Sequence, residues 1–159
     1  MTIRTALAAL TLFALLPLAA APADSAERAT YKAAVEPICK ANKEASQRIL
    51  TGVERMVRHD QLSQAAKRFT HAAAALEKAR KQLAGVPQPP EDAAKLGKWL
   101  SGIKGEVSLM KTIAAKFRSG DKSRGSSLVV KLKNNASKTN NLVIVFQFDY
   151  CKIDPSAIK

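Results

Sequence analysis

Apolar residues recur at alternating spacings of three and four along most of the chain, which is typical of helices that face other helices. The first such stripe contains Tyr31, Val35, Ile38, Asn42, Ala45, Ile49, Gly52 and Met56. This pattern predicts one helix over the whole range. Because proline lacks a backbone donor, Pro37 should either start the regular helix after a short first piece or bend it.

The second stripe is more regular, with large apolar side chains at every seventh position and alanines between them: Leu62, Phe69, Leu76 and Leu83. Asp60 precedes it and fits an N-cap, because its carboxylate can accept from the first free amide groups of a helix. The segment "GVPQPP" should end this helix, since Gly85 suits a left-handed cap and the prolines cannot continue the helix.

A third stripe follows this proline-rich linker: Leu96, Leu100, Ile103, Val107, Met110, Ala114 and Phe117, with Trp99 expected at its edge. Three glycines lie inside the stripe, at positions 97, 102 and 105. They indicate either close packing or a break near Gly102, and we expect one continuous helix with a weak middle.

The fourth stripe starts near Asp121 and contains Leu128, Leu132, Asn135, Thr139, Leu142 and Phe146. Its end, "LVIVFQF", has the composition of a strand. A lone strand would have no partner, so we predict that the helix continues through it. The four stripes together predict an all-α protein, an antiparallel up-down-up-down four-helix bundle, over residues 24–151. Residues 152–159 would then be a flexible tail.

Residues 1–23 have the features of a secretory signal. Arg4 precedes an apolar run from Ala6 to Ala21, and Ala21 and Ala23 provide the small residues of a cleavage site. The run is short for a membrane-spanning helix, so we expect a cleaved signal rather than a retained anchor, with no transmembrane segment afterwards. We therefore expect an exported protein of the periplasm, the cell envelope or the extracellular space.

The chain has two cysteines, Cys39 near the start of the first helix and Cys151 after the fourth. An up-down bundle places these two positions at the same end of the molecule. In an exported protein this arrangement predicts a disulfide, which the chain-entropy model values at about 4.7 kcal/mol for a loop of about 100 residues. A redox or metal-binding pair is less favoured, because redox cysteines usually lie two residues apart.

The segments "YKAAVEPICKAN" and "FQFDYC", together with the proline-rich joint between them, resemble a group of small exported helical proteins and lipoproteins of actinobacteria. Members of that group tend to have one cysteine in the first helix and one at the end of the last. The resemblance implies the same fold and disulfide, and it implies no activity. The chain departs from the group by lacking a lipobox cysteine and by its excess of lysine.

The chain is strongly basic, with 26 lysine and arginine residues against 13 acidic ones and a formal net charge of +13. Four basic residues flank the predicted turn between the third and fourth helices: Lys116, Arg118, Lys122 and Arg124. Such a concentration of charge attracts anionic partners. In an exported protein these would be an anionic envelope polymer or lipid surface rather than nucleic acid. The alternative is a solvated surface that keeps the protein soluble.

Catalytic and metal-binding motifs are not recognisable in the sequence. His59 and His71 lack a second ligand one helical turn away, and Met56 beside His59 is more simply explained as core. The absence of a C-x-x-C-H motif excludes a covalently attached haem. A haem held by His71 together with Met56 or Met110 is an alternative. We therefore expect no enzyme activity, no cofactor and no metal.

Polar residues interrupt two of the predicted apolar stripes, at Asn42 in the first and at Asn135 and Thr139 in the fourth. Buried asparagines can fix the register of neighbouring helices by bonding to each other. They could also line a polar pocket for a small ligand. Two hypotheses follow: a monomeric, non-catalytic protein that docks on an anionic surface through its basic patch, or a soluble carrier with a ligand between its helices.

Overall fold

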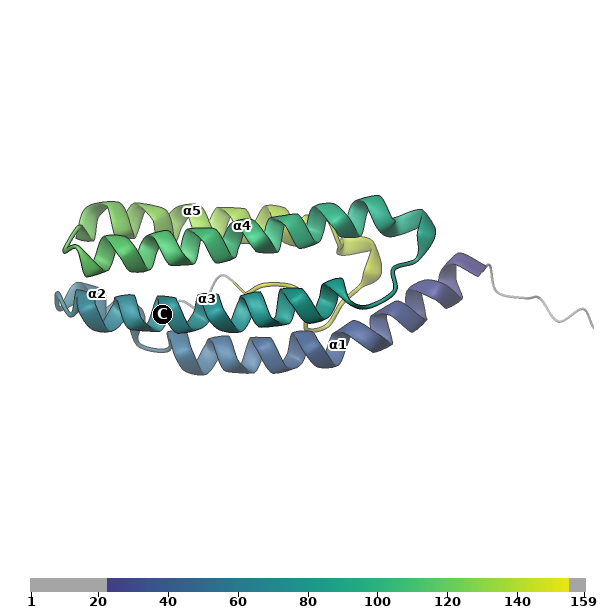
Figure 1. Ribbon diagram of the computed structural model, residues 1–159, viewed down its shortest axis with the longest axis horizontal. Helices are drawn as coiled ribbons and strands as arrows, with labels where there is room; N and C mark the ends of the chain where they lie inside the picture. Colours follow the sequence, from purple (N-terminus) through teal and green to yellow (C-terminus); the bar gives the residue numbers. More distant parts are fainter. Residues whose placement is uncertain (1–22, 155–159) are drawn as a thin grey trace, which may run out of the picture.

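The computed structural model describes residues 23–154, and side-chain surroundings are described from residue 26 onward. This part of the chain is helical and contains no strand. Its elements are four long helices and three short helical segments: α1 (Ala23–Leu50), α2 (Val53–Arg58), α3 (Leu62–Ala84), η1 (Pro90–Asp92), α4 (Ala93–Arg118), α5 (Lys122–Asn141) and η2 (Ile144–Phe146). Figure 1 shows how the α-helices are arranged. The predicted signal segment lies outside the described residues, except for Ala23.

The long helices pack in two layers, with α1 and α3 in one and α4 and α5 in the other (Figure 1). The most extensive contacts join α3 to α4, α4 to α5, and α1 to α3. This packing agrees with the prediction of a helical bundle. The C-terminal segment bonds to Glu36 of α1 and to Asn140 of α5, and it lines the candidate site.

The first predicted helix is wrong only at its C-terminal end, because α1 ends at Leu50, before Met56. Gly52 has a φ of +81°, a left-handed conformation that only glycine adopts without strain, and the short helix α2 begins after it. Pro37 lies inside α1 without ending it. Asp60 does not cap α3; its carboxylate accepts from Lys122 Nζ at 2.7 Å instead.

The third predicted helix is confirmed as a single element, α4. The glycine at its centre allows α5 to come close, since a Cβ atom on Gly102 would lie 2.6 Å from Thr139 Oγ1. Gly97, by contrast, has no atom within 4 Å of such a Cβ position. Gly102 therefore serves the close packing that we considered for this stripe, and the helix does not break there.

Trp99 does not cover the edge of a stripe as predicted but is fully buried. It belongs to an aromatic cluster with Tyr31, Phe146 and Phe148, in which neighbouring ring centroids lie 5.2–6.4 Å apart. These separations are in the range of favourable aromatic pairs. The cluster joins α1, α4 and the C-terminal segment at one end of the molecule.

The prediction that the fourth helix continues through "LVIVFQF" is wrong. The helix α5 ends at Asn141, and the chain passes through η2 to Gln147, which has a φ of +48°. Phe146 and Phe148 are both buried. In a continuous helix, residues two apart point in directions about 200° apart, so both rings can enter one cluster only if the helix ends.

The predicted disulfide is confirmed. Cys39 in α1 and Cys151 are bonded, with their Cα atoms 4.8 Å apart, and the chain has no free cysteine. A disulfide of this kind is typical of proteins outside the reducing cytoplasm. The predicted flexible tail is already tied down at Ile153, whose backbone N–H and C=O bond to the Asn140 side chain at 2.8 Å each. Residues 155–159 lie outside the described part of the chain.

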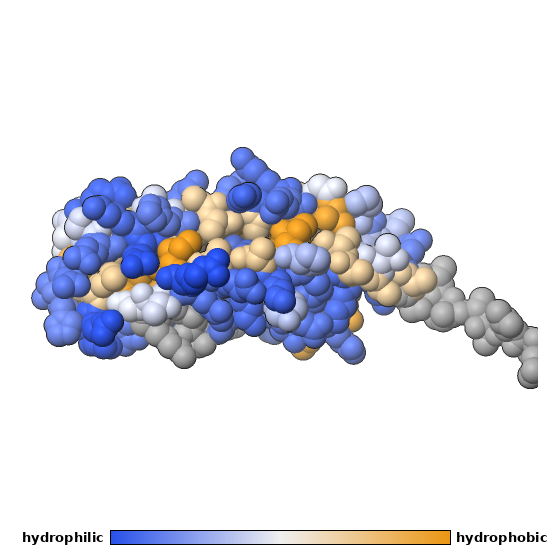
Figure 2. Space-filling view, turned by 90° about the horizontal axis from the view of Figure 1, so that it is seen from below, coloured by the Kyte–Doolittle hydropathy of each residue, from blue (hydrophilic) through white to orange (hydrophobic). Residues whose placement is uncertain are grey.

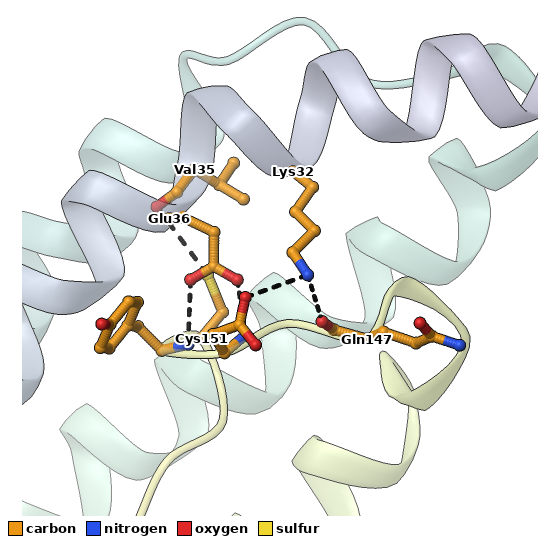
Figure 3. A network of polar contacts seen from close by, with 7 residues as sticks. Lys32, Val35, Glu36, Gln147 and Cys151 are labelled. Atoms are coloured by element: carbon orange, nitrogen blue, oxygen red, sulfur yellow. Dashed lines mark hydrogen bonds and ion pairs between the residues drawn. The ribbon is translucent and has the colours of Figure 1, made fainter.

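The C-terminal segment is also bound to α1 through polar contacts (Figure 3). The Glu36 carboxylate accepts from the backbone N–H groups of Asp149 and Tyr150 at 2.6 and 2.9 Å. Lys32 donates to the carbonyl of Gln147 and pairs with Asp149 at 3.1 Å. These contacts hold the segment beside α1 on the N-terminal side of the disulfide.

Candidate functional site

A pocket of about 70 Å³ lies between the four long helices and the C-terminal segment. Its walls are mainly apolar, and every long helix contributes at least one of them: Leu50, Leu76, Ala79, Leu83, Trp99, Ile103, Met110, Leu132 and Ala136. The C-terminal segment closes one side with residues from Tyr150 to Asp154.

Glu106 of α4 lines this apolar pocket and is fully buried. Its Oε1 accepts from Asn135 Nδ2 at 3.4 Å, and its Oε2 has no hydrogen-bond partner. Burial raises the pKa of Glu106 from 4.5 to about 7, and the neighbouring polar side chains of Thr139 and Asn135 reduce this increase in part. The pocket therefore contains a carboxyl group that changes charge near neutral pH.

Two other pocket residues have buried polar atoms without partners, Asn42 Oδ1 on α1 and Trp99 Nε1 on α4. Buried polar groups are nearly always hydrogen-bonded, because an unmade bond costs about 1–3 kcal/mol. Three residues that line one pocket thus each have a buried polar atom without a partner, which indicates a site whose hydrogen bonds are completed by a bound molecule or by water.

Three lysines line the same pocket: Lys43 on α1, Lys133 on α5 and Lys152 in the C-terminal segment. The first two are half-buried and the third is exposed. Because all three both line the pocket and reach solvent, they lie at its opening. Asp154 is the acidic residue at this opening. Lys43 Nζ also lies 5.8 Å from the centre of the Tyr150 ring, a cation–π contact.

Of the three polar residues predicted to form a pocket, only Asn42 lines it. Thr139 packs against Gly102, and Asn135 bonds to Glu106 and, at 3.5 Å, to the carbonyl oxygen of Gly102. Among the described residues, no hydrogen bond joins one asparagine side chain to another. The structure therefore does not support the alternative that asparagines fix the register of the helices by bonding to each other. Asn135 instead helps to position the Glu106 carboxyl group.

Glu106 itself was missed by the sequence reasoning, although a signal was present. Trp99, Ile103, Glu106 and Met110 follow spacings of four, three and four, the same pattern as the stripe that we assigned. All four are buried. A carboxylate at a stripe position should have been recognised as a candidate site, because an acidic side chain is rarely buried without a partner.

The four residues of the predicted basic patch gather at the turn between α4 and α5. Three of them are paired within the chain: Lys122 with Asp60 at 2.7 Å, Arg124 with Asp121 at 3.8 Å, and Lys116 with Asp121 at 3.9 Å. Arg118 donates to Thr70 Oγ1 at 3.3 Å. The positive charge of this turn is thus partly offset by two aspartates.

Hydrophilic residues cover most of the face that carries α1, with apolar atoms in a discontinuous band along its length (Figure 2). His59 and His71 are exposed. Within residues 23–154 no group of three or more metal-ligating side chains is close enough to hold an ion. None of the helices described in this range is long and apolar enough to cross a membrane.

The fold and site define a class: a helical protein closed by a disulfide, with an internal pocket that contains a buried carboxyl group. Comparison with known protein families gave no match, and neither the curated proteins nor the solved structures gave a significant one. The resemblance to exported actinobacterial proteins therefore stays a prediction. The function has to be argued from the site.

Proposed function

We propose that this chain is an exported, non-catalytic carrier that binds one small molecule in the pocket between its helices. In this proposal the long helices form the antiparallel up-down-up-down bundle expected from the sequence. The C-terminal segment, held by the disulfide, forms a fixed wall of the site. The disulfide itself supports export, because such bonds persist in oxidising compartments.

The observation that carries this proposal is the Glu106 carboxyl group, which is buried in an apolar pocket with one oxygen unpartnered. The other buried acidic residue in the described part of the chain, Asp92, forms a two-bond ion pair with Arg28. Glu106 has no such cation. A buried acid kept without a counterion lowers stability, and groups of this kind concentrate at functional sites.

Native mass spectrometry of protein purified from its own host tests this proposal. We expect a bound small molecule at one copy per chain. An Ala136→Phe variant should lose that molecule, because the larger side chain fills the pocket. A matched Ala94→Phe variant, at an exposed position of α4, should keep it. A wild-type protein that carries no bound molecule, or a pocket-filled variant that retains it, would contradict the proposal.

Docking on an anionic surface is the second candidate, and one observation favours it. Lys116, Arg118, Lys122 and Arg124 all lie around a single turn at one end of the molecule. Each basic residue near an anionic membrane contributes about 1 kcal/mol to binding. Because two aspartates pair with basic residues of this turn, we rank surface docking below the pocket.

A further inference from the structure

We propose that the ligand of this pocket is a small bifunctional amphiphile, with a hydrogen-bond donor at its inner end, an apolar middle and an anionic group at its outer end. This inference rests on the proposed carrier function and adds the chemistry of the molecule carried. We infer each part of this ligand from one feature of the site: its unpartnered oxygens, its apolar walls and the lysines at its opening.

The hydrogen-bond donor at the inner end of the ligand is inferred from two oxygens of the site that have no hydrogen-bond partner. Glu106 Oε2 and Asn42 Oδ1 both accept hydrogen bonds, and both are buried in the lining of the pocket. A purely apolar ligand would leave them without partners and would exclude the water that could otherwise reach them. A hydroxyl or an ammonium group supplies the missing donor. A bond to a charged partner is also stronger than a neutral one.

The outer end follows from the lysines at the opening. Lys43, Lys133 and Lys152 come from three different segments of the chain and meet at one pocket, where Asp154 is the acidic residue. No hydrogen bond or ion pair of the three ammonium groups is present within the described residues; only Lys43 has a ring contact. A carboxylate or phosphate at this position would be attracted by all three, and the net charge of +13 favours its approach.

The apolar middle of the ligand is inferred from the leucine-rich walls of the pocket and from the volume of the pocket. A space of about 70 Å³ between these walls suits a short aliphatic chain, and we take six carbons as the length to test. Each buried methylene should strengthen binding about fourfold until the pocket is filled. The chemistry therefore points to a hydroxy or amino acid whose two functional groups lie at opposite ends of a short aliphatic chain.

Fluorescence titration of the full chain tests this ligand chemistry, because Trp99 is the single tryptophan and lines the pocket. The probes are 6-hydroxyhexanoate, 6-aminohexanoate, hexanoate, hexan-1-ol and hexane-1,6-diol. We expect one or both of the ω-substituted carboxylates to bind at least tenfold more tightly than hexanoate. The comparison of hydroxyl with amine identifies the donor.

Two sets of variants separate the ends of the ligand. Glu106→Met should bind the ω-substituted carboxylates no more tightly than it binds hexanoate, so that the ratio of their dissociation constants is close to one. Glu106→Gln, which keeps an acceptor oxygen, serves if the methionine variant does not fold, and it should weaken the amine more than the hydroxyl. Lys43→Gln, Lys133→Gln and Lys152→Gln combined should weaken every carboxylate and leave hexane-1,6-diol unchanged.

The inference is overturned if hexanoate and hexan-1-ol bind as tightly as the ω-substituted acids, or if the lysine variants affect the diol and the carboxylates equally. It is also overturned if no probe binds. In that last case native mass spectrometry distinguishes the two proposals: a molecule retained from the host leaves the carrier function standing and removes only this ligand class.

Discussion

Glu106 is the most important residue for the proposed function, because its buried environment disfavours the negative charge that a glutamate side chain has in water at neutral pH. Its carboxyl group lies among apolar side chains, with Asn135 and Thr139 as its polar neighbours on α5. The other titratable side chains that line the pocket come from α1, α5 and the C-terminal segment: Lys43, Lys133, Tyr150, Lys152 and Asp154. The lysines lie at the opening, so none of them neutralises the buried group.

The raised pKa of Glu106 predicts that the protein becomes less stable as pH rises from 4.5 to about 7. In this range the unfolded chain has already lost the proton that the folded chain keeps, so raising the pH favours unfolding. The stabilising contribution is complete below pH 4.5 and is lost as pH rises through about 7. A shift of this size corresponds to about 3 kcal/mol.

Chemical denaturation of the wild type and of Glu106→Gln across this pH range measures the effect. The difference in unfolding free energy between the two proteins should change by about 3 kcal/mol from pH 4.5 to pH 8. Glu44→Gln, at an exposed position of α1, should show no comparable change. Parallel pH profiles for the wild type and Glu106→Gln would show that the carboxyl group is not buried as described.

At the scale of elements, Gly102 lies at a close contact between α4 and α5. A Cβ atom on Gly102 would be 2.6 Å from Thr139 Oγ1 and 2.9 Å from Thr139 Cγ2. Gly102→Ala should therefore destabilise the fold by about 1–3 kcal/mol, the range typical of overpacking. Thermal unfolding measures this loss.

Gly97 on the same helix provides the matched control. A Cβ atom there meets nothing within 4 Å, so Gly97→Ala should be stabilising by up to about 1 kcal/mol, through helix propensity alone. Combining Gly102→Ala with Thr139→Ala should recover part of the lost stability. Equal effects of alanine at positions 97 and 102 would contradict the close contact.

The disulfide connects α1 to the C-terminal segment, and its removal tests how firmly that segment is held. Changing both Cys39 and Cys151 to serine should cost about 2–4 kcal/mol and lower the melting temperature by about 5–15 °C. The Glu36 carboxylate should still accept from the backbone N–H groups of Asp149 and Tyr150 in this variant. The C-terminal segment should therefore stay beside α1 as far as Tyr150. Hydrogen exchange should show new exposure after residue 151, and unchanged exchange there would contradict this role of the bond.

The helical elements were largely predictable from the sequence because their apolar spacing is regular, and the exceptions have local causes. The end of α1 depends on the positive φ of Gly52, which a glycine at a stripe position does not reveal. The segment after Asn141 depends on two phenylalanines entering one aromatic cluster with Tyr31 and Trp99. Such long-range packing is absent from local periodicity.

For the whole molecule, the pairing of Cys39 with Cys151 could be predicted because it needs only the order of the helices and the compartment. The pocket could be predicted only in outline. Asn42 was identified from its stripe and Glu106 could have been, whereas the three lysines at the opening come together only in three dimensions. The residues of the basic patch lie around one turn, as predicted. The sequence did not indicate that Asp60, which is distant in the chain, forms an ion pair with Lys122 of this patch.

Vesicle co-sedimentation tests the surface-docking alternative on the whole molecule. If the patch acts as proposed, the protein should pellet with anionic phosphatidylglycerol vesicles and not with neutral phosphatidylcholine vesicles. Binding should weaken at high salt, where charges are screened over about 3 Å rather than about 10 Å. Changing Lys116, Arg118, Lys122 and Arg124 to glutamine should abolish it.

Four exposed lysines outside the turn provide a control of equal charge, and their replacement by glutamine should affect vesicle binding less: Lys67, Lys78, Lys104 and Lys111. Equal losses in the two variants would show that the net charge acts rather than the patch. Pelleting with neutral vesicles to the same extent would remove the hypothesis.

The central claim is that the pocket beside Glu106 is where a small molecule binds, and methyl NMR tests it most directly. The protein is titrated with the tightest-binding probe of the six-carbon series while its assigned methyl signals are followed. The account predicts saturable shifts of the methyl groups that line the pocket, on Leu50, Leu76, Ile103 and Leu132. Shifts confined to the exposed Val130, Ile144 and Val145, or a bound probe that leaves the pocket methyl signals unchanged, would contradict it.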